Sequence, residues 1–121
     1  MAKNILFVDD AVEITSFAKR ALANKGYNVK IAYNGEDALN IAQSMYQSNQ
    51  TLDLLISDTN MPFMDGPELI KECLALDKNI KILQMSGKES KVPEAHEFLA
   101  KPYSIEQLYE KVSLLLSEKN N

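Results

Sequence analysis

The sequence predicts an α/β protein: one parallel, doubly wound sheet of five strands with helices on both faces. Short runs typical of strands alternate with segments of helical period along all 121 residues. Strands that alternate with helices form a parallel sheet through right-handed crossovers. A chain of this length suits a single core, so we expect one domain over residues 1–121 with its core at about 4–118.

The five expected strands are short and mostly apolar. They lie at residues 5–8, 27–31, 52–57, 80–85 and 98–100. Only residues 27–31 alternate between apolar and polar side chains, a pattern typical of a strand with one wet face at a sheet edge. Five strands with a wet second strand suit the order 2-1-3-4-5.

Between these strands, apolar residues recur at helical spacing and predict helices with one inward stripe. Gly26 closes the first helix, and Asn34 and Ser104 are plausible N-caps of the second and the last. The expected stripes are Ile14, Phe17, Ala18 and Ala21; Ala38, Ile41, Ala42 and Met45; Leu69, Ile70, Cys73 and Leu74; and Ile105, Leu108, Val112, Leu115 and Leu116.

The segment between the fourth and fifth strands is too short for a full crossover. Residues 87–100 must supply a loop, any helix, a second loop and the fifth strand. Typical lengths are about 11 residues for a helix, about 5 for a strand and roughly 2 to 6 for each loop, which exceeds this segment. The segment also has no apolar helical stripe, and Pro93 would interrupt a helix. We expect the fourth helix to be absent or cut to about one turn.

Composition and charge exclude several function classes. The formal net charge is −4 and the pI about 5.0, so the surface is unsuited to nucleic acid or to an anionic membrane. A single cysteine, Cys73, cannot form an internal disulfide and is expected in the core. The apolar run at residues 5–8 is too short for a signal peptide or a membrane span. A cytoplasmic protein is therefore the expectation.

Polar residues suited to chemistry follow four of the five strands. They are Asp9 and Asp10 after the first, Asp58 after the third, Ser86 and Gly87 after the fourth, and Lys101 and Pro102 after the fifth. Singly, each has a simple structural explanation: Asp10 could cap the first helix, and a lone lysine is usually solvated. In an open parallel sheet, however, the carboxyl ends of the strands meet at one edge, where ligands bind.

Three carboxylates at that edge would repel one another. At about 4 Å and an effective dielectric near 20, each pair costs roughly 4 kcal/mol, which a bound cation would relieve. Oxygen ligands without histidine or cysteine select a hard cation such as Mg²⁺, which keeps positions open for phosphate oxygens. Lys101 adds a point charge suited to phosphate, Ser86 a hydroxyl donor, and Asp58 a nucleophile that could form an aspartyl phosphate.

These motifs resemble the receiver domains of bacterial response regulators, proteins of two-component signalling that include chemotaxis regulators. Residues 58–66 (DTNMPFMDG) resemble the phosphoacceptor loop, residues 7–10 (FVDD) the acidic pair, residues 85–87 (MSG) the switch hydroxyl, and residues 101–102 (KP) the lysine with its typically cis proline bond. The likeness runs from about Asn4 to Glu118 and implies a flavodoxin-like fold.

The resemblance implies a role for each matching residue. Asp58 would accept the phosphoryl group, and Ser86 and Lys101 would hold its oxygens. Asp10 and Asp58 would bind Mg²⁺ directly, Asp9 mainly through a water, and Asn60 through its backbone carbonyl. Ser86 and Phe98 would form the conformational switch, although Phe98 lacks the hydroxyl of the tyrosine common there and could equally be a core residue of a short strand.

The function implied is a signalling module that assists its own phosphorylation and dephosphorylation and is no dedicated enzyme. Its partners would be a sensor histidine kinase or a histidine phosphotransfer protein and a downstream protein target. In the family, the face made by the fourth helix, the fifth strand and the fifth helix commonly carries dimerisation and output, so a shortened fourth helix puts that dimer mode in doubt. A monomer or weak dimer is expected. The switch would then act mainly through residues 86–97 and the exposed side of the last helix. Whether the chain acts alone or is part of a longer regulator stays open.

Three alternatives follow from the same residues. A phosphohydrolase of the haloacid-dehalogenase type also uses an aspartate and Mg²⁺, but it keeps an Asp-x-Asp motif after its first strand, where this chain has the adjacent pair Asp9 and Asp10. A flavodoxin-like electron carrier would need a phosphate loop where the chain has acidic residues. A degenerate receiver that only docks would have lost an acidic position or the lysine, and this chain retains them.

Overall fold

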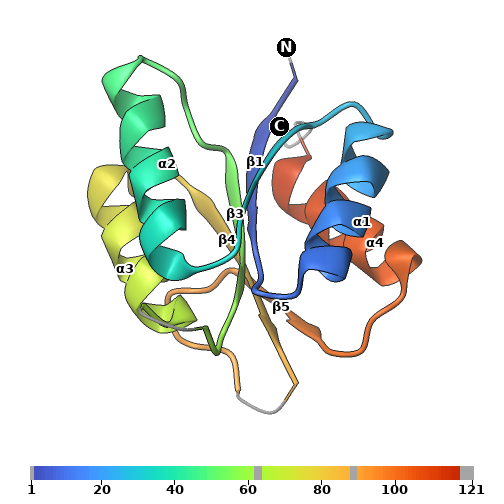
Figure 1. The fold of residues 1–121 in the computed structure, drawn as a ribbon. Coiled ribbons are helices and arrows are strands. Elements are labelled where there is room, and N and C mark those ends of the chain that lie inside the picture. The colour runs from blue at the N-terminus through green and yellow to red at the C-terminus, as the bar shows by residue number, and fades with distance from the viewer. Residues whose placement is uncertain (1, 62–63, 88–89, 118–121) are drawn as a thin grey trace.

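The computed structural model describes residues 2–61, 64–87 and 90–117, and within them it contains one parallel sheet in the order β2-β1-β3-β4-β5 (Figure 1). The predicted fold class and strand order are confirmed. The strands are β1 (Asn4–Val8), β2 (Asn28–Ala32), β3 (Leu54–Asp58), β4 (Lys81–Ser86) and β5 (Glu97–Ala100), and the helices are α1 (Val12–Ala23), α2 (Gly35–Gln47), α3 (Gly66–Leu76) and α4 (Ile105–Leu116). Glu118, the expected end of the core, lies outside the described residues.

The sheet separates two layers of helices, with α1 and α4 on one face and α2 and α3 on the other (Figure 1). Side chains on β1 alternate between the two cores. Leu6 and Val8 pack with α2 and α3, whereas Ile5 and Phe7 pack with α1 and α4. Because both faces of the central strands are covered, residues 5–8 of β1 and 54–56 of β3 are continuous apolar runs. None of the helices within the described residues is both long and apolar enough to cross a bilayer.

Three of the described helices begin with a side-chain cap. Asn34 accepts a hydrogen bond from Asp37, Asp65 accepts one from Glu68, and Ser104 forms a reciprocal capping box with Gln107. The predictions for Asn34 and Ser104 are confirmed.

The first helix starts differently. Its N-cap is Ala11, which has no side-chain cap hydrogen bond, so Asp10 does not cap α1. Instead the Asp9 carboxylate accepts from the Ala11 amide at 3.0 Å, and the Thr15 hydroxyl donates to the Ala11 carbonyl at 2.7 Å. The simple structural explanation of Asp10 is therefore wrong, and its carboxylate stays exposed beside the sheet edge.

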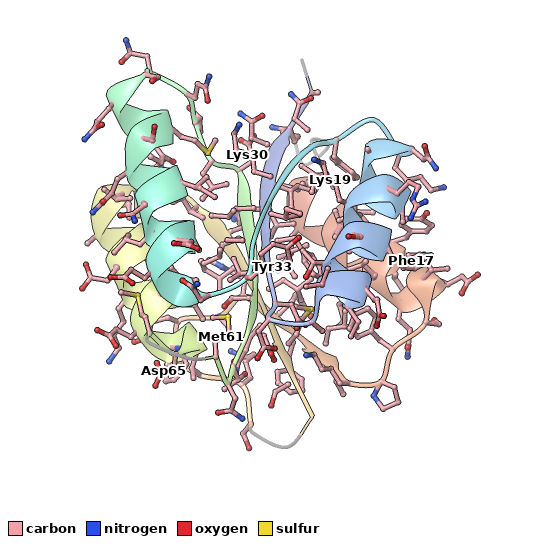
Figure 2. All side chains as sticks on the ribbon, viewed as in Figure 1. Phe17, Lys19, Lys30, Tyr33, Met61 and Asp65 are labelled. Carbon is pink, nitrogen blue, oxygen red and sulfur yellow. The ribbon has the colours of Figure 1, made fainter. Side chains whose placement is uncertain are left out.

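Part of the predicted α1 stripe is wrong. Ala18 and Ala21 are buried as expected, but Phe17 is 56% exposed and Ile14 is 41% exposed, whereas Thr15 is fully buried. The apolar face of α1 is thus rotated partly out of the core. Figure 2 shows Phe17 on the outer part of α1, on the side of the molecule where α4 lies.

The segment between β4 and β5 contains no helix among its described residues, Gly87 and 90–96. A turn at Pro93 and Glu94 takes the place of a helix, and Val92 and Ala95 pack against the core shared with α2 and α3. The expected shortening is confirmed for these residues; Lys88 and Glu89 lie outside the described part of the chain. The chain still returns to a parallel β5, with Gln84 opposite Phe98.

His96, the residue just before β5, extends the pairing with β4 by one residue, a role that sequence reasoning missed. Its backbone amide donates to the Ile82 carbonyl at 2.9 Å, and its ring Nδ1 accepts from the Ile82 amide at 2.9 Å. Nδ1 must be unprotonated to accept. Partial burial and the charges of Lys81 and Lys91 lower the pKa of His96, in agreement with this geometry.

Candidate functional site

The carboxyl ends of β1, β3, β4 and β5 bring the predicted site residues to one edge of the sheet. Asp9 follows β1, Asp58 ends β3, Ser86 ends β4 and Lys101 follows β5. The ladder sets their relative heights, because Asp58 lies opposite Met85 and the Lys101 amide donates to the Ser86 carbonyl at 2.9 Å. Parallel pairing therefore gathers side chains up to 92 positions apart in sequence.

Lys101 is the central cation of this edge. Its Nζ lies 2.8 Å from Asp9 Oδ2 and 3.1 Å from Asp58 Oδ1. The Asp9 side chain is 1% exposed and that of Asp58 is 11% exposed, whereas Lys101 retains 25% exposure. Two nearly buried carboxylates thus share one ammonium that still reaches solvent. The Lys101–Pro102 peptide bond is cis, as the resemblance implied.

Asp9, Asp10 and Asp58 form a cluster whose carboxylate oxygens lie within 4.8 Å of one another. Asp10 and Asn60 are exposed, so the open side of the cluster faces solvent. The donors are oxygens only, in a group too close for three unneutralised charges, which fits a hard divalent cation that retains several waters. The residues present therefore fit Mg²⁺.

The pKa values reflect this crowding. Burial first and the Asp9 charge second raise the pKa of Asp58, while Lys101 opposes them. The two carboxylates in turn raise the pKa of Lys101 despite its partial burial. The lysine therefore stays charged, and the Asp58 carboxylate is more basic than that of a solvated aspartate.

Backbone contacts hold Asp58 in place. The Thr59 amide donates to Asp58 Oδ1 at 3.0 Å, and the Gly66 amide donates to the Thr59 carbonyl at 2.8 Å. A Cβ at Gly66 would lie 2.3 Å from the Asp58 carbonyl oxygen, so only glycine allows α3 to start this close. Pro62 and Phe63 of the loop motif lie outside the described residues. Figure 2 shows Met61 and Asp65 at the lower end of the molecule, where this loop leads into α3.

The two residues of the expected switch lie on neighbouring strands. Ser86 is 2% exposed at the end of β4, and Phe98 is half-buried in β5. Sequence reasoning missed two further buried polar residues beside them, Thr59 and Gln84. The available signal was the glutamine itself, a long polar side chain inside the otherwise apolar run of residues 80–85.

Comparison with known proteins identifies the family. The response regulator receiver domain family matches residues 5–113. The chain belongs to this family of receiver domains. It is 31% identical to sporulation initiation phosphotransferase F of Bacillus subtilis, over 100% of this chain and 99% of that protein. Among solved structures, the receiver domain of the hybrid histidine kinase CckA is 41% identical, with a TM-score of 0.81 over 93% of this chain and 98% of that one.

A third relative was solved with ligands. The chain is 27% identical to a structure described as the CheX-CheY-BeF3-Mg+2 complex from Borrelia burgdorferi, with a TM-score of 0.82 over 93% of this chain and 88% of that one. Other relatives are longer proteins. This receiver spans 13% of the sensor kinase CckA of Brucella abortus and about half (51%) of the response regulator MprA of Mycobacterium bovis. The family match leaves the phosphohydrolase and electron-carrier alternatives without support.

The receiver also has an apolar groove next to Lys101. A hollow of about 520 Å³ lies between α1 and α4, and its lining includes Lys101, Pro102 and Tyr103. The rest of the lining is Glu13, Ile14, Phe17, Ala18, Ile105 and Leu108. The exposed part of the α1 stripe therefore belongs to a continuous apolar surface that reaches the site.

Proposed function

We propose that this receiver domain accepts a phosphoryl group on Asp58 from a phosphohistidine and signals through a change of shape. The observation that carries the proposal is the pair of contacts of Lys101 with Asp9 and Asp58, next to a cluster of three carboxylates. A nucleophile, a phosphate-binding cation and a set of oxygen ligands thereby meet at one solvent-facing edge.

The transfer would be a displacement at phosphorus. An Asp58 carboxylate oxygen attacks the phosphorus, and a new O–P bond forms as the P–N bond to the donor imidazole breaks. The electron pair of that bond goes to the ring nitrogen, which takes up a proton. Lys101 and the Ser86 hydroxyl would hold the phosphoryl oxygens as charge shifts onto the acyl phosphate.

Mg²⁺ would be held directly by Asp10, Asp58 and the backbone carbonyl of Asn60, with Asp9 acting mainly through a water. When bound, the ion would neutralise the carboxylates and the incoming phosphoryl oxygens, which otherwise repel the attacking group. The exposure of Asp10 and Asn60 supports this assignment, because a hydrated ion and a phosphate must enter from the same side.

The phosphodonor is a sensor histidine kinase or a histidine phosphotransfer protein. A donor must bring its imidazole to Asp58, and the lining of the apolar groove between α1 and α4 includes Lys101, whose Nζ lies 3.1 Å from Asp58 Oδ1. A protein that fills this groove with an apolar helix face would place a phosphohistidine at the site. Phe17 lines the groove and is exposed, and exposed Val12 extends the docking surface along α1.

The output involves Ser86, Phe98 and the short segment that precedes β5. A phosphoryl group on Asp58 would draw the Ser86 hydroxyl toward it, and half-buried Phe98 on the neighbouring strand would repack. Gly87 and residues 90–96 contain no helix, so this change would reach the surface through loop residues of the described chain.

Intact-mass measurement tests the proposal. Incubation with a small phosphodonor and Mg²⁺ should add the mass of one phosphoryl group to the parent and none to Asp58→Asn. Asp65→Asn is the matched control, since asparagine retains the N-cap of α3 while removing a nearby carboxylate. An adduct that persists in Asp58→Asn would place the acceptor elsewhere. An unmodified parent would favour the alternative of a receiver that only docks.

A further inference from the structure

Buried polar side chains connect the proposed phosphoacceptor, Asp58, to residues 90–92 of the segment between β4 and β5. Gln84, 1% exposed in β4, donates from Nε2 to the Thr59 hydroxyl at 2.9 Å and to the Ser90 carbonyl at 3.3 Å. Its Oε1 accepts from the Val92 amide at 2.7 Å. One side chain thus bonds to Thr59, the residue that follows β3, and to two points of the segment before β5.

Thr59 connects this glutamine to the acceptor itself. The Thr59 hydroxyl donates to the Met85 carbonyl at 2.8 Å. The Thr59 amide donates both to Asp58 Oδ1 at 3.0 Å and to the Met85 carbonyl at 2.9 Å. Thr59 is 6% exposed, so no bulk water competes for these bonds. The path from the Asp58 carboxylate to the Val92 amide therefore runs through Thr59 and Gln84 without a gap.

We propose that Gln84 is a positioning residue that ties residues 90–92 to the phosphoacceptor, so that modification of Asp58 is read at Val92. The inference rests on the proposed function, because it needs Asp58 to be the modified group. It adds a route distinct from Ser86 and Phe98.

The chemistry of the acceptor gives the direction of the effect. An acyl phosphate has one carboxyl oxygen bonded to phosphorus and no carboxylate charge, so Asp58 becomes a weaker acceptor for the Thr59 amide. Thr59 keeps its bonds to the Met85 carbonyl but loses part of its restraint on the Asp58 side, and so does the Gln84 amide that donates to its hydroxyl. Modification should release the Val92 end of the segment.

Amide hydrogen exchange at Val92, followed by nuclear magnetic resonance, tests whether Gln84 holds the Val92 amide in the unmodified protein. Gln84→Met keeps the side-chain length but removes the amide, and the Val92 amide should exchange roughly tenfold faster or more, as expected for loss of a buried hydrogen bond. Gln43→Met, the same change at an exposed glutamine of α2, should leave Val92 unchanged. Equal exchange in Gln84→Met and the parent would overturn the proposal.

Beryllofluoride with Mg²⁺, a stable analogue of a phosphoryl group on a carboxylate, tests the coupling. The Val92 amide of the loaded parent should exchange several-fold faster than that of the free parent. Thr59→Val cuts the route but leaves the Gln84 bond to Val92, so loading should no longer change the exchange rate. Thr59→Ser restores the hydroxyl and should restore the response.

Two results would overturn the coupling: a loaded parent whose Val92 exchange is unchanged or slower, or a response that survives in Thr59→Val. Failure of the proposed function is seen separately, because the intact mass of the parent after a small phosphodonor reports on Asp58 alone. A parent that gains the phosphoryl mass yet shows no response at Val92 refutes only this inference. A parent that gains none refutes both.

Discussion

Asp58→Asn should stabilise the folded receiver when no divalent ion is present. Oxygens of Asp9, Asp10 and Asp58 lie within 4.8 Å of each other, and two unit charges at that distance repel by roughly 3.5 kcal/mol at an effective dielectric near 20. Asp58 takes part in two such repulsions. Its attraction to Lys101, over 3.1 Å, is worth roughly 5 kcal/mol on the same scale.

The repulsions of Asp58 outweigh its attraction to Lys101, so its charge destabilises the folded protein. Solvent screening reduces the repulsion from exposed Asp10, but burial adds a desolvation cost to the charged Asp58. Asparagine removes the charge yet keeps an oxygen for the Thr59 amide, and Lys101 keeps Asp9 as a partner at 2.8 Å. We expect the free energy of unfolding to rise by about 1 to 2 kcal/mol, which raises Tm by roughly 4 to 8 °C.

Thermal unfolding of the parent and of Asp58→Asn, followed by circular dichroism in chelator and in Mg²⁺, measures this change in Tm. Mg²⁺ should stabilise the parent by RT ln(1 + [Mg²⁺]/Kd) and the variant far less. The difference in Tm between the variant and the parent should therefore shrink or change sign as the ion is added. Glu72→Gln, which removes an exposed carboxylate of α3, should change the free energy of unfolding by less than about 0.5 kcal/mol. A variant that melts at or below the parent in chelator would show that the Lys101 pair outweighs the repulsion.

The pH dependence of the same difference has a definite sign. Folding raises the pKa of Asp58, so the folded protein binds more protons than the unfolded chain above the ordinary value of 3.8. The parent therefore loses stability as pH rises through the raised pKa. The advantage of Asp58→Asn should be full above that pKa and vanish below about 3.8.

Three further substitutions test other parts of the molecule. Asp10→Asn removes a charged ligand and should weaken Mg²⁺ binding at least roughly tenfold by calorimetric titration; an unchanged affinity would contradict the ligand assignment. Phe17→Ala should slow phosphoryl transfer from a donor protein but not from a small phosphodonor, whereas Leu114→Ala, on exposed α4 surface outside the groove, should slow neither. His96→Asn keeps an acceptor for the Ile82 amide without a titrating group. Because folding lowers the pKa of His96, the parent loses stability as pH falls below 6.5, and urea titrations of the variant should show a flatter profile there.

Sequence periodicity and chain length predicted most of this fold for identifiable reasons. Parallel pairing leaves few ways to connect alternating strands and helices, so the strand order followed from one wet strand. The lack of a helix among the described residues between β4 and β5 followed from the length of that segment and from Pro93, both of which are local. The strand-end residues met at one edge because parallel strands place all their carboxyl ends there.

What could not be predicted depends on contacts between distant elements. Periodicity fixed which residues of α1 share a stripe, but not that Phe17 would border an open groove instead of a neighbouring helix. No local pattern reveals that a histidine ring nitrogen extends the ladder at Ile82. The bonds of Gln84 join residues whose proximity arises only when β3, β4 and the segment before β5 have all folded.

The contact of Gly66 with Asp58 limits how the receiver can rearrange. With the Gly66 amide bonded to the Thr59 carbonyl, and no room for even a methyl group between α3 and β3, the start of the helix and the end of the strand behave as one rigid piece. If Asp58 is the acceptor, as proposed, a displacement that begins there would meet packed backbone on the α3 side. It would travel more easily toward β4 and residues 90–92, which Gln84 holds through side-chain hydrogen bonds. Under the proposed function, this difference in mechanical stiffness across the site would set the direction of signalling.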